Sequence, residues 1–341
     1  MKNKVDTREK FREFDMINYR TNRPILIFCI ILVGALMLFS FLKQPAYASE
    51  GGSSSYTPGT YGDFSMNYAA PGLYFRENIV YYTGKLDDIP LLPTINGNAK
   101  QTTWFNLLGV SYVAQKKLLG GHYFISANAA YGFSAKLDLD VPGVGHFEDE
   151  TSGLADVWIT PFGLMWNLGN FHITLAESFV LPAGRYNSDN LVNMGRNYTS
   201  YETDFGLTWL DEKNGNEVSF LAGYMINSKN QATDYKTGEE FHIDYAINQY
   251  FSESFAIGIT GYYYQQITDD SSPSLDAINQ TNSSLGLSTP DGYKSNGAGV
   301  GPAIMFGLSK DVQVIAKWIH EYDAKNRFKG DWAFLSLSIK F

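Results

Sequence analysis

Histidine and carboxylate side chains are the groups in this chain that could carry out acid–base chemistry. After its first 48 residues the chain holds five histidines: His122, His146, His172, His242 and His320. Asp244 follows His242 by two positions, which places both side chains on one face of a β-strand. An aspartate in that position could orient the imidazole as a general base. No serine stands at a spacing that marks an activated nucleophile, so we interpret the pair as part of a hydrogen-bond network and keep a hydrolase as the alternative.

Other polar and aromatic side chains share a strand face in the same way. Asp156 with Trp158, Glu202 with Asp204, and Lys317 with Glu321 are each separated by an even number of positions. The predicted lining of the interior consists of Asp156, Trp158, Glu202, Asp204, His242, Asp244, Tyr262, Tyr264, Lys317, Glu321 and Trp332. Charges there would attract cations or form structural ion pairs, since buried charges need partners. The excess of acids makes anion selectivity the least expected property of a pore.

The sequence predicts neither a metal site nor a cofactor. The chain has one cysteine, which excludes a zinc site built from cysteines and a disulfide framework. Acidic residues cluster in 140–150 and 269–292, but they lack the spacing of a calcium-binding loop. We expect these acids to form a solvated surface, where divalent ions could bridge it to anionic lipopolysaccharide.

The first 48 residues are predicted to be a secretory signal peptide. Residues 25–42 are uncharged and almost entirely apolar, and they follow a lead with seven basic residues. Ala46, Tyr47 and Ala48 then form a small-x-small cleavage sequence. The apolar run is longer than usual, so an uncleaved anchor is the alternative. Met16 is a candidate true start that would leave a lead of ordinary length.

The remaining chain reads as membrane-crossing β-strands. Segments of about ten residues alternate apolar and polar positions, and none has the long apolar run of a membrane helix. In the last segment one face carries Ala333, Leu335, Leu337, Ile339 and Phe341. The predicted strands are 72–84, 102–115, 122–139, 154–168, 171–181, 198–210, 217–228, 240–250, 255–268, 293–308, 312–322 and 331–341. We therefore expect about twelve strands, within a range of roughly 10 to 14.

The connections between these strands alternate in length. The short ones span 116–121, 169–170, 211–216, 251–254 and 309–311, and those between them are mostly longer: 85–101, 140–153, 182–197, 229–239, 269–292 and 323–330. Outer-membrane barrels have short periplasmic turns and long external loops. The pattern predicts an all-β fold, a transmembrane antiparallel up-and-down β-barrel over residues 72–341.

Composition agrees with a barrel wall that has a lipid-facing and a polar side. Residues 49–341 carry 31 acidic and 18 basic residues, a net charge of −13 that argues against nucleic-acid binding. The chain holds 52 aromatic residues, yet its mean hydropathy is −0.19. Alternation of lipid-facing and lumenal positions explains both values. Glu177 and Glu77 fall on apolar faces, which predicts a β-bulge or an early end of the embedded stretch.

The two ends of the barrel sequence have separate expected roles. Phe341 is a terminal aromatic residue that resembles the signal by which C-terminal strands reach the barrel-assembly machinery. Residues 49–71 begin with a stretch rich in Gly and Ser, which predicts a flexible periplasmic lead. A plug inside the lumen is the alternative.

Four stretches resemble an outer-membrane family named for meta-pathway phenol degradation. They are 152–161 (SGLADVWITP), 181–186 (LPAGRY), 235–245 (YKTGEEFHIDY) and 262–270 (YYYQQITDD), the last followed later by Gly301 and Pro302. Residues 70–74 (APGLY) match more loosely. The resemblance implies an outer-membrane barrel that passes hydrophobic or aromatic compounds, and it does not imply an enzyme of phenol breakdown.

The sequence thus predicts a passive outer-membrane channel for small, hydrophobic or aromatic solutes. Lumenal aromatic and polar groups would supply affinity, and twelve strands would leave a narrow or gated path. The expected partners are outer-membrane lipid, lipopolysaccharide, the assembly machinery and the solute. The alternatives are a barrel hydrolase that uses His242 and Asp244, and a structural or adhesive barrel that binds through its loops.

Overall fold

The structure is a computed structural model that describes residues 52, 54–87, 98–141, 145–284 and 294–341. These residues all belong to one folded unit, Pro45–Phe341. The predicted signal peptide, including Met16, Ala46 and Ala48, lies outside the described residues. No helix in the described part of the chain is both long and apolar enough to pass through a membrane.

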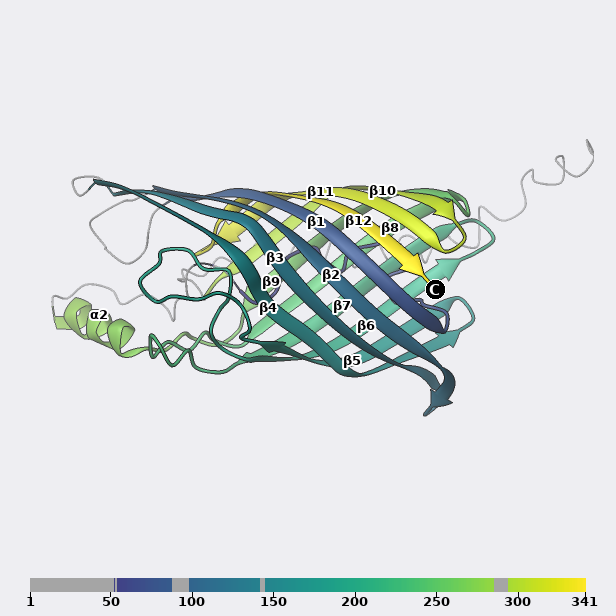
Figure 1. The fold of residues 1–341 in the computed structure, drawn as a ribbon, viewed down its shortest axis with the longest axis horizontal. Helices are drawn as coiled ribbons and strands as arrows, with labels where there is room; N and C mark the ends of the chain where they lie inside the picture. The colour runs from purple at the N-terminus through teal and green to yellow at the C-terminus, as the bar shows by residue number, and fades with distance from the viewer. Residues whose placement is uncertain (1–51, 53, 88–97, 142–144, 285–293) are drawn as a thin grey trace, which may run out of the picture. The chain divides into compact units, whose positions relative to one another are not determined.

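Twelve antiparallel strands form a closed barrel (Figure 1). The strands are β1 (Gly72–Asp87), β2 (Asn98–Leu118), β3 (Gly121–Val141), β4 (Gly145–Leu168), β5 (Phe171–Leu181), β6 (Ser200–Asp211), β7 (Asn216–Asn227), β8 (Glu240–Ser252), β9 (Phe255–Gln266), β10 (Asn296–Ser309), β11 (Val312–Lys325) and β12 (Lys329–Lys340). Each strand pairs with its neighbours in sequence, and β1 pairs with β12 to close the wall. Closure leaves no unpaired strand edge facing lipid. The predicted fold and strand number are confirmed.

Side chains alternate between an exposed outer face and a buried inner face. Along β5, Phe171, Leu175 and Phe179 are exposed, whereas His172 and Thr174 are buried. Because the barrel is closed, the buried positions of each strand face the interior and the exposed apolar positions face outward. An outward apolar surface with a polar interior is the arrangement that lets a β-barrel reside in lipid.

The two ends of the barrel have different connections. At one end the turns are short, and the turn between β2 and β3 consists of Leu119 and Gly120, which both have positive φ (50° and 83°). Two such residues favour the tight hairpin turn that matches strand twist. At the other end lie the helix α2 (Pro273–Ser284) and the projecting β3–β4 hairpin, opposite the C-terminus (Figure 1).

Two connections predicted as loops have regular structure. Residues 140–153 were expected to be a loop, but β3 and β4 continue to Val141 and from Gly145, so the hairpin projects beyond its neighbours. Residues 269–292 contain the helix α2. Strands and helices that face water on all sides need no apolar face, so their polar sequences gave no periodic signal.

The outward carboxylates keep the alternation of their strands. Glu177 stays on the outer face of β5, and the hydroxyls of Tyr201 and Thr203 on β6 donate to it. Glu77 on β1 accepts a hydrogen bond of 2.8 Å from Asn106 on β2. The phase of β5 and of β1 does not switch at either residue, although the paired strand β4 has a register shift beside Glu177, between Ile159 and Phe162. Donors from neighbouring strands make an outward carboxylate tolerable.

Candidate lumenal site

The eleven residues predicted to line the interior all lie on the inner side of the wall. Ten of them are buried and Trp158 is half-buried. They come from β4, β6, β8, β9, β11 and β12. Their contacts divide them into three groups: those that bind the chain before β1, those that bind each other, and those that hold a loop.

The chain before β1 runs along the interior, and we call residues 54–71 the lumenal segment. Ser54 donates to Glu240 at the start of β8 (2.7 Å), next to the long β7–β8 connection. Ser65 N lies 3.0 Å from both carboxylate oxygens of Glu217, near the short β6–β7 turn. The segment therefore extends from the long-loop end to the short-turn end. These contacts match the plug alternative rather than a flexible periplasmic lead.

Buried polar side chains of the wall hold the middle of the lumenal segment. Lys317 Nζ donates to the carbonyls of Gly59 (2.6 Å) and Gly62 (3.2 Å) and pairs with Asp63 at 2.7 Å. Arg76 also pairs with Asp63. The side-chain amide of Asn67 donates to Phe220 O at 2.9 Å. Lys317 thus has its partner in the lumenal segment and not in Glu321, because the two-residue period fixes the face of a side chain but not what lies across the lumen.

Glu202, Asp204, His242 and Asp244 form a buried group that we call the acid–histidine cluster. His242 Nε2 lies 2.6 Å from Glu202 Oε1, and His242 Nδ1 lies 3.6 Å from Asp244 Oδ2. Tyr56 of the lumenal segment donates to Asp244 Oδ2 (2.6 Å) and stacks on the imidazole with ring centroids 3.8 Å apart. The cluster therefore joins two strands of the wall to the lumenal segment.

The cluster has buried polar atoms without a hydrogen-bond partner. Asp204 Oδ1, Asp244 Oδ1 and His242 Nδ1 form no hydrogen bond within the described residues, although all three side chains are at least nine-tenths buried. His242 has no serine in hydrogen-bond contact in the described part of the chain, and its stacking partner is a tyrosine. The arrangement is a pocket of carboxylate oxygens around one imidazole.

Glu321 belongs to a separate and well-satisfied network. It accepts hydrogen bonds from Trp332 Nε1 (2.9 Å), Gly330 N (2.6 Å), Tyr82 OH (3.1 Å) and Tyr262 OH. In the same region the Arg327 guanidinium lies 4.5 Å from the ring centre of Tyr264. Four donors satisfy the carboxylate, so this network serves to brace the wall.

Asp156 and Trp158 share a face but have different partners. Asp156 accepts hydrogen bonds from Gly184 N (3.0 Å) and Arg196 N (2.7 Å), so it anchors the β5–β6 loop. Trp158 Nε1 donates to Glu202 Oε2 (3.3 Å) and so connects β4 to the acid–histidine cluster.

A cavity of about 150 Å³ lies between the start of the lumenal segment and the wall. Aromatic side chains form much of its lining, namely Tyr56, Tyr82, Phe105, Trp158, Phe328 and Trp332. Gln101, Thr103, Asn193 and Arg196 supply polar groups. A cavity of this size is large enough for one benzene-sized molecule.

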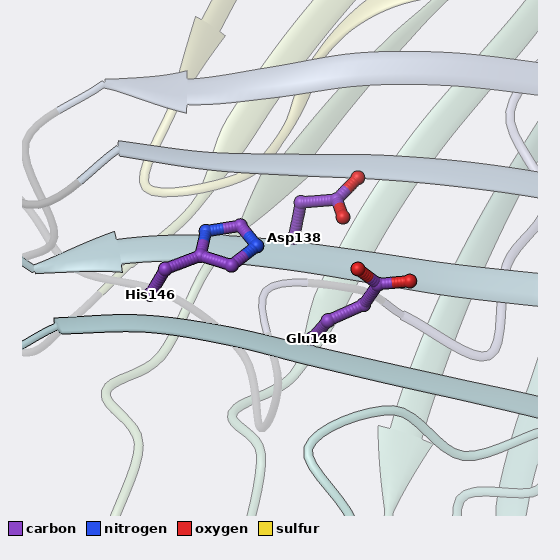
Figure 2. Close-up of side chains that lie close together, drawn as sticks. All are labelled: Asp138, His146 and Glu148. Atoms are coloured by element: carbon purple, nitrogen blue, oxygen red, sulfur yellow. The ribbon is translucent and has the colours of Figure 1, made fainter.

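A second histidine–carboxylate group, the tip cluster, lies on the projecting β3–β4 hairpin. Asp138, His146 and Glu148 point toward one another from paired strands, with ligand atoms within 4.8 Å (Figure 2). Lys136 already lies 2.7 Å from Glu148 and 3.4 Å from Asp138, and His146 Nδ1 lies 2.8 Å from Asp140. The group is largely exposed, and Lys136 offsets part of its acidic charge.

Sequence reasoning missed several of these residues. Glu240 lies two positions before His242, so the strand period could have found it. His146 and Glu148 have the same two-residue spacing. The Gly- and Ser-rich lead also contains Tyr56, Tyr61 and Asp63. Aromatic and charged residues of this kind could have indicated that the lead packs against the barrel and is not a plain linker. Glu217 and Arg327 gave no local signal.

The geometry defines an outer-membrane β-barrel with an occupied lumen. The chain belongs to the family described as "Putative MetA-pathway of phenol degradation", whose profile matches residues 83–337. The predicted family, fold and outer-membrane location are confirmed.

Two solved structures are similar to this chain at low sequence identity. An outer-membrane channel from Pseudomonas putida F1 superposes with a TM-score of 0.65 at 12% identity, covering 84% of this chain and 100% of that one. The beta domain of the Bordetella autotransporter BrkA gives a TM-score of 0.46 at 10% identity, covering 80% and 100%. The comparison with curated proteins finds no match. At these identities the likeness concerns the fold.

Proposed function

We propose that the protein is an outer-membrane channel that passes small, single-ring aromatic solutes. The observation that carries this proposal is the aromatic-lined cavity of about 150 Å³ between the lumenal segment and the wall. Binding sites for small molecules are typically concave and mostly apolar, with a few polar groups that set orientation. This cavity has that composition, and the family described above is named for phenol degradation.

The polar groups in the lining favour a ring that carries a hydroxyl or a similar substituent. Gln101 and Thr103 lie on β2, while Asn193 and Arg196 lie on the β5–β6 loop, so donors and acceptors stand on two sides of the rings. A sugar of similar size would leave most of its hydroxyls facing aromatic carbon, where unpaired polar groups are costly. We therefore expect the channel to select a substituted aromatic ring over a sugar.

Passage through this channel requires the lumenal segment to move. A barrel of twelve strands is intermediate between side-chain-filled barrels of eight strands and open porins of 16 to 18. The segment occupies that interior from Glu240 to Glu217. We therefore expect slow, selective flux instead of the general permeability of a wide pore.

An uptake assay with whole cells tests this proposal. Cells with and without the protein are given labelled phenol at low concentration, and the phenol taken up is measured. Expression should raise phenol uptake and leave glucose uptake almost unchanged. Trp158→Ala should raise the phenol concentration that gives half-maximal uptake, because it removes a ring from the cavity. Trp104→Ala is the matched control, since Trp104 is outward-facing and 49% exposed. Equal stimulation of phenol and glucose uptake would contradict the selectivity, and no stimulation of either would contradict the channel.

A further inference from the structure

We propose that the acid–histidine cluster is a binding site for a divalent transition-metal ion of the zinc class. Glu202 and Asp204 on β6 and His242 on β8 each offer a ligand atom, and these atoms lie within 4.8 Å of one another. Carboxylate oxygen with imidazole nitrogen is a donor set that zinc and its neighbours bind well. Ligands about 2.0–2.2 Å from one ion are at most about 4.4 Å apart, so small side-chain movements complete the site.

The wall is shaped to bring these groups together across an intervening strand. The strand β7 separates β6 from β8, and its Gly223 pairs with Asp204 on one side and His242 on the other. A Cβ atom at Gly223 would come within 2.2 Å of His242 Nε2 and 2.8 Å of Glu202 Oε1. Glycine therefore lets the imidazole and the carboxylate meet above β7.

Charge provides the second, independent argument. Three carboxylates surround one histidine, and no Lys or Arg of the described residues forms an ion pair with any of the three. Asp204 Oδ1 and Asp244 Oδ1 also lack hydrogen bonds within the same residues, although these side chains are only 5% and 0% exposed. Buried carboxylate oxygens without hydrogen-bond partners are costly, and a cation that binds them removes that cost.

Asp244 is suited to a supporting role. A histidine that binds metal through one ring nitrogen usually donates its other N–H to a carboxylate. With Nε2 directed at Glu202 and the metal, Nδ1 faces Asp244 Oδ2 at 3.6 Å. Tyr56 donates to the same oxygen and stacks on His242. The ion would thereby stabilise the lumenal segment in place, and Tyr56 and Trp158 connect the site to the aromatic cavity.

Direct metal binding tests this inference. The folded, full-length barrel in detergent is treated with a chelator, exchanged into clean buffer and titrated with zinc chloride, and bound zinc is counted after desalting. We expect one tightly bound equivalent. The double variant His146→Ala/Glu148→Gln removes the exposed tip cluster and should retain that equivalent. Visible absorption with cobalt chloride should report nitrogen and oxygen ligands in both proteins.

Variants of the cluster identify the ligands. Asp204→Asn and His242→Gln should each weaken zinc binding at least about tenfold. Glu321→Gln is the matched control, because it also removes a buried carboxylate but one that four donors satisfy, and it should bind zinc normally. Heat-modifiable gel migration verifies that each barrel is folded.

Three results would overturn the site. They are less than one-tenth of an equivalent bound by the unaltered barrel, loss of binding in the tip variant, or unchanged affinity in folded Asp204→Asn and His242→Gln. If one of these two variants does not fold, the other variant and the tip variant still test whether the acid–histidine cluster binds zinc.

Discussion

At the scale of single residues, Gly223 is a position where the wall depends on the absence of a side chain. The side chains of His242 and Glu202 occupy the space where a Cβ would lie. Overpacking of this kind usually costs about 1–3 kcal/mol. Gly223→Ala should therefore lower the urea midpoint of unfolding, measured by gel migration in detergent. Adding His242→Ala to the same chain should recover most of the loss, and a double variant as unstable as Gly223→Ala alone would contradict this explanation.

Tyr56 is the residue that joins the lumenal segment to the acid–histidine cluster. Tyr56→Phe keeps the stacked ring but leaves Asp244 without its donor, at a cost of about 1–3 kcal/mol. We expect the segment to leave its position more often, which single-channel recording would detect as more frequent openings. Tyr68→Phe is the matched control, since Tyr68 belongs to the same segment and is 41% exposed. Equal opening frequencies in both variants would argue against this role of Tyr56.

The residues also mark the limit of prediction from sequence. The two-residue period correctly put His242 beside Asp244 and Glu202 beside Asp204 on their strands, because that period is local. The contact between Glu202 and His242 depends on a third strand and a glycine, and the pair of Lys317 with Asp63 joins residues 254 positions apart. Local periodicity carries no information about partners across a lumen.

At the scale of elements, Asp270 connects two external loops. It accepts hydrogen bonds from Gly238 N (2.8 Å), Gln266 Nε2 (2.7 Å) and Tyr235 OH, so it ties the β7–β8 connection to the chain before α2. Burial raises the pKa of the Asp270 carboxyl to about 7. Because an unfolded aspartate has a pKa of about 3.9, the docked loops hold this proton more tightly than the released loops do.

The docked loops should therefore become less stable as pH rises. The stability linked to Asp270 is complete below about pH 4 and is lost as pH rises through about 7. Hydrogen exchange of 229–239 should accordingly be slower at pH 5 than at pH 8, after correction for the intrinsic rate. Asp270→Asn mimics the protonated form and should remove this difference. If the difference persists in that variant, another group is responsible.

The elements that sequence reasoning missed share a physical cause. Strand periodicity is strong where one face meets lipid, and it identified β5 with the bounds 171–181 that the structure has. Above the lipid both faces of a strand contact water, so the residues around His146 and Glu148 carry no alternation in polarity. The helix α2 is mostly polar, and its few apolar residues, Leu275, Ala277 and Ile278, form no repeating apolar face to detect.

At the scale of the whole molecule, the lumenal segment controls whether the barrel is a pore. Deleting residues 54–67 removes the side chains that contact Glu240, Asp244 and Lys317, and the backbone N–H that donates to Glu217, while keeping β1 intact. Conductance in planar bilayers should rise several-fold, because the emptied lumen fills with water. The folded deletion variant should show heat-modifiable migration. Unchanged conductance in that variant would contradict a plugging role.

The pairing of β1 with β12 has a consequence for how this protein is made. The wall is a continuous ladder, so it offers no gap through which a chain could pass sideways. The lumenal segment directly precedes β1, the first strand synthesised, whereas its partner strand β12 is the last. The segment is therefore enclosed either before these two strands meet or by endwise threading. Once β1 pairs with β12, the lumenal segment can no longer enter the barrel from the side. A segment that is still outside at that point must enter through one end of the barrel.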